Sequence, residues 1–317
     1  MNRREAAKQA KKESWRSTLA ALAQERGFFE EIGNNHKALY LPQEGERGKT
    51  LVVAFDNLDD SRQSSDRLPW AVDFISSQGW SSLGFMAHGP TWYRDEAVVD
   101  FFDKMRDEKF FDQFERVVFY GTSMGGYAAA AFSAAAPGST VVAINPQATL
   151  SRSDANWEQR FRAAWRYDYS GPYSFAPEMA ASAERVWLFY DSRIPADAMH
   201  AAHFNTPNVT HIRCPFMGHG MLVIWRQMGI LKDVVAGCID GTHSKTDVHR
   251  LFRARYDSGR YLRMVLDYLV AQEKHKRVIR YADLVMKRYP RAPYFVAARK
   301  QARAALLEMR QQRKVRV

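Results

Sequence analysis

Short apolar runs alternate with longer amphipathic stretches through most of the chain. Runs rich in β-branched, aliphatic and aromatic residues predict strands at 51–55, 80–86, 117–120, 140–144, 185–190 and 209–214. Continuous apolar runs are typical of strands that are buried on both faces, as in a parallel sheet. Helices are predicted between these strands, from apolar residues at helical spacing, over 66–78, 95–111, 196–204 and 221–236. The alternation predicts an α/β fold with a doubly wound, mostly parallel sheet.

The two ends of the chain depart from this alternation. Residues 1–27 predict a basic N-terminal helix, and residues 28–41 predict an early strand or hairpin. Residues 245–317 contain no strand-like run and predict about three or four helices, with a break at Tyr289-Pro290. The run 275–290 is similar to the second helix of a tetratricopeptide unit, but a repeat array needs at least about three units to bury its core. We therefore predict a helical appendage over 241–317 with one partial unit.

The segment 116–132 places a serine between a strand and a helix. It reads Gly121-Thr-Ser123-Met-Gly125 after an apolar run and continues into an alanine-rich stretch with high helix propensity. Strand, G-x-S-x-G and helix in this order are the context of a nucleophile elbow. Glycines on both sides of the serine remove Cβ atoms that would collide in so sharp a turn. The following helix directs N–H groups toward the place where a negative oxygen would form, so Ser123 is the candidate nucleophile.

Residues 49–236 resemble an α/β-hydrolase superfamily domain, with the nucleophile elbow as the most specific motif. In that superfamily the partners of the serine follow in the order Asp or Glu, then His, each after a strand. Asp191 follows the strand 185–190, and His219 lies in a glycine-flanked loop after the strand 209–214. The resemblance implies Ser123 as nucleophile, His219 as general base and then acid, and Asp191 as the residue that orients the imidazole. It places the hydrolase domain at 28–240.

The histidine and the acid each have alternatives in the sequence. His88 follows an earlier strand and is able to line the pocket, and His211 lies inside a strand, where it would point across the sheet. Asp154 and Asp168 lie in the excursion after the elbow's neighbouring strand. Asp191 also precedes Ile194-Pro195, so it is alternatively a helix N-cap.

Further site residues follow from their positions after strands. The resemblance implies an oxyanion hole formed by the N–H of Met124 and an N–H from the loop after strand 51–55, for which we choose Asn57. This loop lacks the glycine-rich pattern of many lipases and esterases. Candidate substrate-binding side chains after neighbouring strands are Trp92, Tyr93, Arg94 and Gln147. The aromatic excursion at about 148–184 occupies the place where hydrolases carry a lid.

A looser resemblance concerns the elbow together with Asn145-Pro-Gln147 and Trp92-Tyr-Arg94. These short motifs are similar to bacterial hydrolase-like proteins that modify acyl groups of capsular and surface glycans. This resemblance implies an acyltransferase or deacetylase as the alternative to a serine esterase. A third hypothesis is a binding protein that keeps the hydrolase fold as a scaffold and uses its basic tail. A complete set of candidates for the triad favours an enzyme, and we expect a small-molecule or glycan ester as its substrate.

Charge is distributed unevenly along the chain. Residues 245–317 contain 20 Lys and Arg against 6 Asp and Glu, a balance of +14, whereas residues 1–244 have a balance of −3. The basic helices suggest an anionic partner such as a glycan or a membrane surface, or else a solvated face. Tyrosines interleaved with this charge fit helix packing equally well, so nucleic acid is not favoured.

Composition also bears on the compartment and on cofactors. The two cysteines, Cys214 and Cys238, form no disulfide framework, which favours a reducing compartment. The charged N-terminus lacks the apolar core of a signal peptide, and no run reaches the ~18 apolar residues of a membrane span. We therefore expect a cytoplasmic protein. Cysteine and histidine show no metal-ligand spacing, so no metal or dissociable cofactor is implied.

Overall fold

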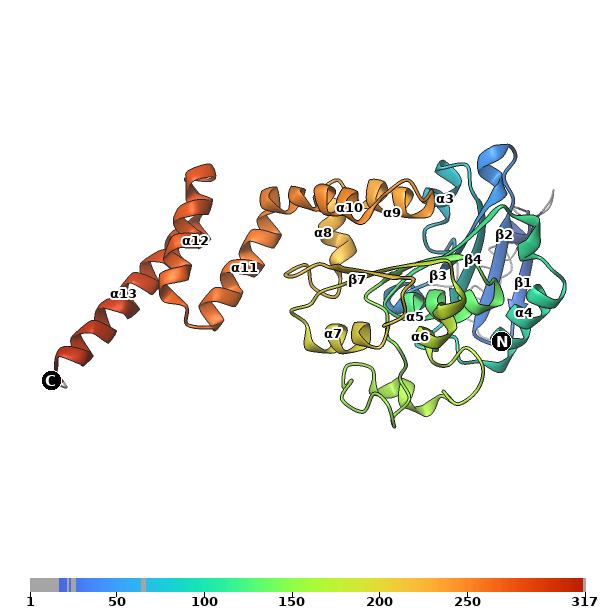
Figure 1. Ribbon diagram of the computed structural model, residues 1–317, viewed down its shortest axis with the longest axis horizontal. Helices are drawn as coiled ribbons and strands as arrows, with labels where there is room; N and C mark the ends of the chain where they lie inside the picture. Colours follow the sequence, from blue (N-terminus) through green and yellow to red (C-terminus); the bar gives the residue numbers. More distant parts are fainter. Residues whose placement is uncertain (1–16, 22, 24–26, 64–66, 316–317) are drawn as a thin grey trace, which may run out of the picture. The chain divides into compact units, whose positions relative to one another are not determined.

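The structure, a computed structural model, describes residues 17–21, 23, 27–63 and 67–315 (Figure 1). The chain divides into two compact units. The first unit runs to Pro215 and includes Lys232–Lys245, and the second comprises Phe216–Leu231 and Thr246–Val317. The predicted boundary at 240 falls near the Lys245 end of the first unit. The segment Phe216–Leu231, which was expected in the hydrolase domain, groups instead with the C-terminal helices.

The first unit contains an eight-stranded sheet in the order β1-β2-β4-β3-β5-β6-β7-β8. Its strands are β1 (Phe28–Ile32), β2 (His36–Leu41), β3 (Thr50–Phe55), β4 (Ser81–Ala87), β5 (Arg116–Thr122), β6 (Thr140–Ile144), β7 (Arg185–Tyr190) and β8 (Val209–Arg213). Strand β2 is antiparallel to both of its neighbours, and the pairs from β4 through β8 are parallel. This confirms the predicted α/β fold with a mostly parallel sheet.

Helices connect the parallel strands, as the periodicity predicts. In the first unit they are α2 (Leu58–Ser61), α3 (Val72–Ser77), α4 (Glu96–Asp107), α5 (Met124–Phe132), α6 (Ala176–Met179), α7 (Pro195–Ala202) and α9 (Leu231–Ile239). Short 3-10 helices lie at Glu46–Lys49, Phe111–Gln113, Ser133–Ala135, Arg162–Arg166 and Ala180–Ser182. The excursion after β6 contains the short helix α6, the 3-10 helices at Arg162–Arg166 and Ala180–Ser182, and no strand.

A stack of phenylalanine rings joins the sheet to two of its helices. Phe55 of β3 lies 5.9 Å from Phe102 of α4, and Phe102 lies 4.4 Å from Phe132 of α5, between ring centroids. All three side chains are buried. Each such burial stabilises the fold by roughly 2–3 kcal/mol, so this core fixes α5 against the sheet and with it the turn that precedes α5.

Two predicted helices differ from the observed ones. The helix predicted at 66–78 begins only at Val72, because Asp56 accepts the N–H of Trp70 and Ala71 adopts a left-handed φ of 64°. The single helix predicted at 221–236 is two helices, α8 (Met221–Gln227) and α9. Gly229, with φ 71°, ends α8, and the N–H of Ile230 bonds back to the carbonyl of Trp225. This is the glycine C-cap that terminates many helices.

The N-terminal helix is described only in part. Residues 1–16 of the predicted helix lie outside the described residues, and residues 17–21 are helical. Leu19 and Ala23 are buried against Leu39 of β2 and Met86 of β4. The apolar part of the segment therefore covers one face of the sheet.

The second unit is helical. It contains α8, α10 (Lys245–Leu251), a 3-10 helix at Phe252–Asp257, α11 (Gly259–Ala271), α12 (His275–Arg288) and α13 (Pro293–Val315). Helix α12 packs on both α11 and α13, with buried Leu266, Val278 and Phe295 between them. The break between α12 and α13 lies at the predicted position. Among the described residues, no helix is long and apolar enough to cross a bilayer.

Candidate active site

Ser123 occupies a strained turn between β5 and α5. Its backbone has φ 53° and ψ −119°, a combination that non-glycine residues rarely adopt. The N–H of Ser123 donates to the carbonyl of Ile144 at 2.8 Å, and its own carbonyl accepts the N–H of Tyr127 at 2.9 Å. Ser123 is half-buried, whereas its neighbours on both sides are buried. The turn therefore presents the hydroxyl-bearing residue at the end of the sheet.

Two glycines make this turn sterically feasible. A Cβ atom on Gly121 would lie 2.1 Å from the carbonyl oxygen of Gly125. A Cβ atom on Gly125 would lie 2.5 Å from the carbonyl oxygen of Phe55 and 2.9 Å from that of Asp56. Real side chains do not approach backbone atoms so closely. The second contact also shows that the end of β3 lies directly against the first turn of α5.

This contact bears on the predicted oxyanion hole. Met124 is the first residue of α5, and Asn57 directly follows the Asp56 carbonyl that meets Gly125. The side chain of Asn57 caps the short helix α2, where its Oδ1 accepts the N–H groups of Asp59 and Asp60. The predicted role therefore concerns the backbone N–H of Asn57 and not its amide side chain.

Asp191 lies at the end of β7 and is buried, with 1% of its surface exposed. Its Oδ1 accepts the N–H of Arg193 at 2.8 Å, and its own N–H donates to Oδ1 of Asn145 at 3.3 Å. Asn145, which follows β6, has a left-handed φ of 47° and donates its N–H to the carbonyl of Phe189. The alternative role of Asp191 as an N-cap does not apply, because the N-cap of α7 is Ile194.

His219 belongs to the second unit, in the segment between Gly218, which has φ 74°, and α8. Ser123 and Asp191 belong to the first unit. The triad of Ser123, His219 and Asp191 thus stays a prediction from chain order.

The alternative histidines have structural partners. Nε2 of His88 lies 2.9 Å from Nζ of Lys37, and Nε2 of His211 lies 2.7 Å from the carbonyl oxygen of Phe204.

Three of the four predicted substrate-binding side chains are buried and bonded inside the protein. Nε1 of Trp92 donates to Oε1 of Gln147 at 2.9 Å, and the hydroxyl of Tyr93 donates to the carbonyl of Asp56 at 2.8 Å. Trp92, Tyr93 and Gln147 are each at most 1% exposed. Stacking of Trp92 or Tyr93 on a substrate would require displacement from the core. The structure favours a positioning role for these three side chains, whose hydrogen bonds connect the loops after β3, β4 and β6.

Arg94, the fourth, anchors the excursion that was predicted as a lid. Its guanidinium donates to the carbonyls of Asp168, Pro172 and Tyr173 at 2.9–3.1 Å and lies over the ring of Tyr169. The hydroxyl of Tyr127 in α5 donates to the carbonyls of Tyr173 and Ser174. These bonds hold residues 168–174 against Arg94 and α5, within the first unit.

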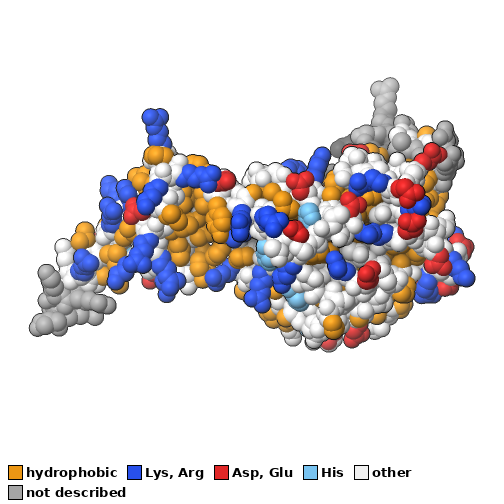
Figure 2. Space-filling model, turned by 45° about the horizontal axis from the view of Figure 1, so that its top comes forward, with side chains coloured by type: hydrophobic (Ala, Val, Ile, Leu, Met, Phe, Trp, Pro, Cys, Tyr) orange, Lys and Arg blue, Asp and Glu red, His pale blue; other side chains and the backbone are white. Residues whose placement is uncertain are grey.

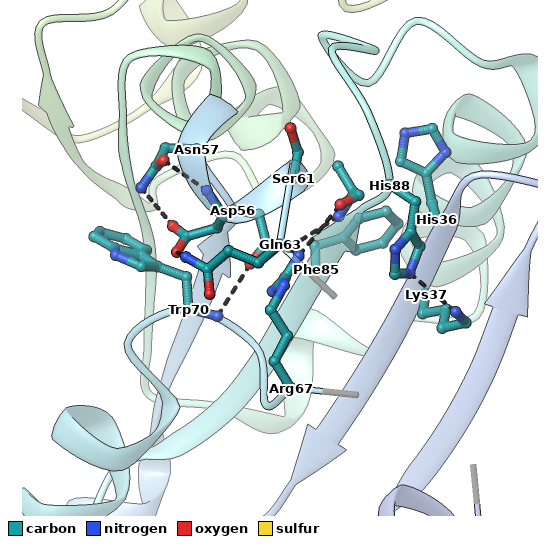
Figure 3. A network of polar contacts seen from close by, with 12 residues as sticks. His36, Lys37, Asp56, Asn57, Ser61, Gln63, Arg67, Trp70, Phe85 and His88 are labelled. Carbon is teal, nitrogen blue, oxygen red and sulfur yellow. Dashed lines mark hydrogen bonds and ion pairs between the residues drawn. The ribbon is translucent and has the colours of Figure 1, made fainter. Parts of the chain in front are cut away.

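The sequence analysis missed a polar network around the loop after β3, shown in Figure 3. Asp56 is fully buried and accepts bonds from Nη2 of Arg67, from the N–H of Trp70 and from the N–H of Ala87. Burial raises the pKa of Asp56, and the Arg67 guanidinium opposes that effect. Burial, followed by the charge of Asp56, raises the pKa of Asp60 to about 6. The network fixes the backbone that leads into Asn57.

A second unforeseen network holds the loop after β6. Nδ1 of the buried His200 accepts the N–H of Ala148 at 3.1 Å, so its Nε2 is the nitrogen that donates to Glu158. Burial opposes ionisation of Glu158, but bonds from His200 and Arg160 outweigh it and lower the pKa to about 2. Arg160 also donates to Asp197 at 2.7 Å. Glu158 and Arg160 are two residues apart, but Ala148, Asp197 and His200 join them only through tertiary contacts, so no local pattern shows the network.

Among the residues that the structure describes, no group of three or more His, Cys, Asp or Glu side chains is arranged to hold a metal ion. Cys214 and Cys238 are both buried and unbridged. Burial raises the pKa of the Cys238 thiol, which disfavours a reactive thiolate.

The strand order and the strained serine after β5 define an α/β-hydrolase domain. The chain belongs to the alpha/beta hydrolase family, whose model matches residues 38–270. No curated protein sequence matches the chain.

Similar solved structures include the capsule O-acetyltransferase of Neisseria meningitidis serogroup A, at 13% identity and a TM-score of 0.44, over 66% of this chain and 96% of that one. An esterase of Pyrococcus furiosus has 14% identity and a TM-score of 0.44, over 68% and 90% of the two chains. A proline iminopeptidase of Mycobacterium smegmatis has 9% identity and a TM-score of 0.42, over 68% and 100%. Identities this low carry no information on the substrate.

Proposed function

We propose that the protein is a serine hydrolase that cleaves a carboxylic ester through an acyl-enzyme on Ser123. The observation that carries this proposal is the backbone of Ser123, held at φ 53° and ψ −119° between two glycines at which a Cβ atom would collide with a backbone carbonyl. Strain of this kind costs about 1–3 kcal/mol and persists where the surrounding structure enforces it, most often at functional sites.

In the proposed reaction, His219 removes the hydroxyl proton of Ser123 as the oxygen attacks the ester carbonyl. The N–H groups of Met124 and Asn57 stabilise the tetrahedral oxyanion. His219 then protonates the departing alkoxide, and water hydrolyses the acyl-enzyme with His219 again as base. Asp191 orients the imidazole. The packing of Gly125 against Phe55 and Asp56 supports the pairing of these two N–H donors.

Acyl transfer to an alcohol proceeds through the same intermediate and differs only in the nucleophile of the second step. The resemblance to proteins that modify glycan acyl groups makes transfer or deacetylation on a glycan the second candidate. Because Trp92 and Tyr93 are buried, the side chains expected to stack on a sugar do not support it. Hydrolysis is therefore the first choice.

Turnover of p-nitrophenyl esters of increasing chain length tests the proposal. We expect Ser123→Ala and His219→Ala each to lower kcat/KM about a thousandfold or more, since removal of a triad member has effects of this size. His88→Ala is the matched control and should keep most of the activity. Addition of an alcohol acceptor separates transfer from hydrolysis by the products formed. Undiminished activity of Ser123→Ala would contradict Ser123 as the nucleophile, and a folded wild type that turns over none of these esters would favour a binding protein.

A further inference from the structure

The second unit contains an apolar groove between α11 and α12. Its volume is about 740 Å³, within the range of ligand-binding clefts. Its lining is aromatic and aliphatic with two cations, and consists of Phe216, Tyr256, Tyr261, Leu262, Val265, Tyr281, Leu284, Val285, Lys287, Arg288 and Tyr289. The hydroxyl of Tyr281 donates to the carbonyl of Leu262, and that of Tyr256 accepts a bond from Arg255. Most of the lining thus offers hydrocarbon surface.

Exposed apolar side chains are concentrated in the same unit. Nine of the eleven large hydrophobic side chains that are exposed among the described residues belong to it: Val223, Tyr256, Val270, Leu284, Tyr289, Tyr294, Val296, Leu307 and Met309. Leu284, at 63% exposed, lies in the groove. Figure 2 shows the hydrophobic surface of these helices bordered by Lys and Arg side chains. Single exposed apolar residues are ordinary, but a contiguous apolar surface marks an interaction site.

The charge of these helices specifies the partner further. The +14 balance of residues 245–317 falls on this unit. At the groove, Arg288 pairs with Asp257, whereas no described carboxylate forms an ion pair with Lys287. Arg260 and Arg291 are also exposed, next to Tyr261 and two residues after Tyr289. Tyrosine together with lysine, arginine and aliphatic side chains is the composition of segments at the membrane–water interface.

We infer that the α11–α13 helices bind the surface of an anionic phospholipid bilayer. The groove accepts hydrocarbon at its apolar lining, and Lys287, Arg260 and Arg291 lie at the level of the phosphate headgroups. A nucleic acid would need a continuous cationic track, and the lining contains only two cations. Charge attraction and apolar burial together account for a surface that is both strongly basic and rich in exposed hydrophobic residues. This inference is independent of the proposed ester hydrolysis.

Co-flotation of the full chain with lipid vesicles tests the charge requirement. We expect binding to phosphatidylcholine vesicles that contain about one-third phosphatidylglycerol, and at least about tenfold weaker binding to pure phosphatidylcholine. Combined Arg260→Glu, Lys287→Glu and Arg291→Glu substitutions should also lower binding about tenfold or more, since each basic residue contributes separately. The matched control is Lys104→Glu with Lys109→Glu and Lys232→Glu, three exposed lysines of the first unit, which should bind as wild type. An equal loss of vesicle binding in the control would show that only the net charge of the protein matters, and would contradict the inference.

A second variant tests the groove. Leu284→Asp should weaken binding about fivefold or more without unfolding the protein, because the side chain is largely exposed. Met199→Asp, at an exposed apolar residue of α7 in the first unit, is the control and should bind normally. Binding that is unchanged by Leu284→Asp would overturn the role of the groove.

One further outcome would count against the inference, and one control separates it from the proposed catalysis. Failure of the wild type to bind any anionic vesicle, with retention on DNA or an acidic protein, would assign the surface to another polyanion. Ser123→Ala should bind vesicles as wild type does, so the result stands whether or not the protein hydrolyses esters.

Discussion

At the scale of single residues, the candidate site depends on glycine positions more than on polar side chains. Ser123 keeps its left-handed φ because Gly121 and Gly125 leave room for the backbone of the turn and of β3. A carbonyl oxygen already lies where a methyl group would be placed on either glycine. The absence of a side chain at Gly121 and Gly125 therefore allows the turn that positions the hydroxyl and the candidate oxyanion donors.

Replacement of Gly125 by alanine tests this account. The new Cβ would lie 2.5 Å from the carbonyl oxygen of Phe55, so the end of β3 has to move away from α5. We expect Gly125→Ala to lower the free energy of unfolding by about 2 kcal/mol or more, as backbone strain of this kind does. It should also reduce any Ser123-dependent ester turnover. Chemical denaturation measures the first effect.

Gly126→Ala provides the matched control, because its Cβ would lie 3.1 Å from the nearest backbone atom. Its neighbours need to shift by only a few tenths of an ångström, so the loss of stability should be clearly smaller. Because alanine has the higher helix propensity, equal losses in the two variants would show that general crowding around α5, and not the approach of β3, determines the result.

At the scale of elements, hydrogen bonds between loops hold the carboxyl end of the sheet together. Trp92 bonds Gln147, Tyr93 bonds the carbonyl of Asp56, and Asn145 bonds the N–H of Asp191. On the other side of β4, Nε2 of His36 in β2 lies 2.8 Å from Oγ1 of Thr91. These bonds couple the loops after β3, β4, β6 and β7 to one another and the loop after β4 to the start of β2.

His36 makes one of these couplings sensitive to pH. Burial lowers the pKa of His36 to about 4 from its ordinary value of 6.5, and the charge of Asp95 opposes the shift. As the pH falls from 6.5 toward 4, the unfolded chain takes up a proton that folded His36 does not. The free energy of unfolding should therefore decrease over this window, by up to about 3 kcal/mol at its acid end.

Urea unfolding at a series of pH values measures this effect. In His36→Gln the free energy of unfolding should decrease less between pH 6.5 and 4, because the unfolded variant no longer takes up a proton at this position. His275→Gln, at the start of α12, should follow the wild type. An identical pH dependence in His36→Gln and wild type would contradict a buried neutral His36.

Local pattern predicted most of the elements because strands such as β5, β6 and β7 are nearly continuous apolar runs. It also predicted the elbow, whose chemistry is confined to one short motif. It failed where a single backbone conformation decides the structure, as at Gly229, which divides a helix that periodicity makes continuous.

The sequence analysis also failed to predict which residues after the strand ends are buried. Trp92, Tyr93 and Gln147 resemble exposed loop residues in sequence, and only the packing of separate loops shows that they are buried. The buried carboxylate of Asp56 meets Arg67 through a contact between loops. Glu158 is local to Arg160, but its contact with His200 joins residues that are far apart in sequence.

At the scale of the whole molecule, the candidate functional residues are distributed over both units. The first contains the sheet, Ser123 and Asp191, and the second contains the basic helices, the apolar groove and His219. The segment Phe216–Leu231 leaves the first unit after β8 and the chain returns to it at Lys232. The proposed mechanism therefore requires a residue from each unit. His219→Ala should therefore lower ester turnover without altering vesicle binding.

The most direct measurement of the central claim is covalent labelling of the full chain by a fluorophosphonate, with the modified residue located by mass spectrometry. Only an activated serine reacts rapidly with such a reagent. The account predicts one adduct on Ser123, absent in Ser123→Ala and strongly reduced in His219→Ala, with His88→Ala labelled as wild type. A folded wild-type protein that remains unlabelled, or an adduct on a different serine, would contradict the proposal that Ser123 is the nucleophile.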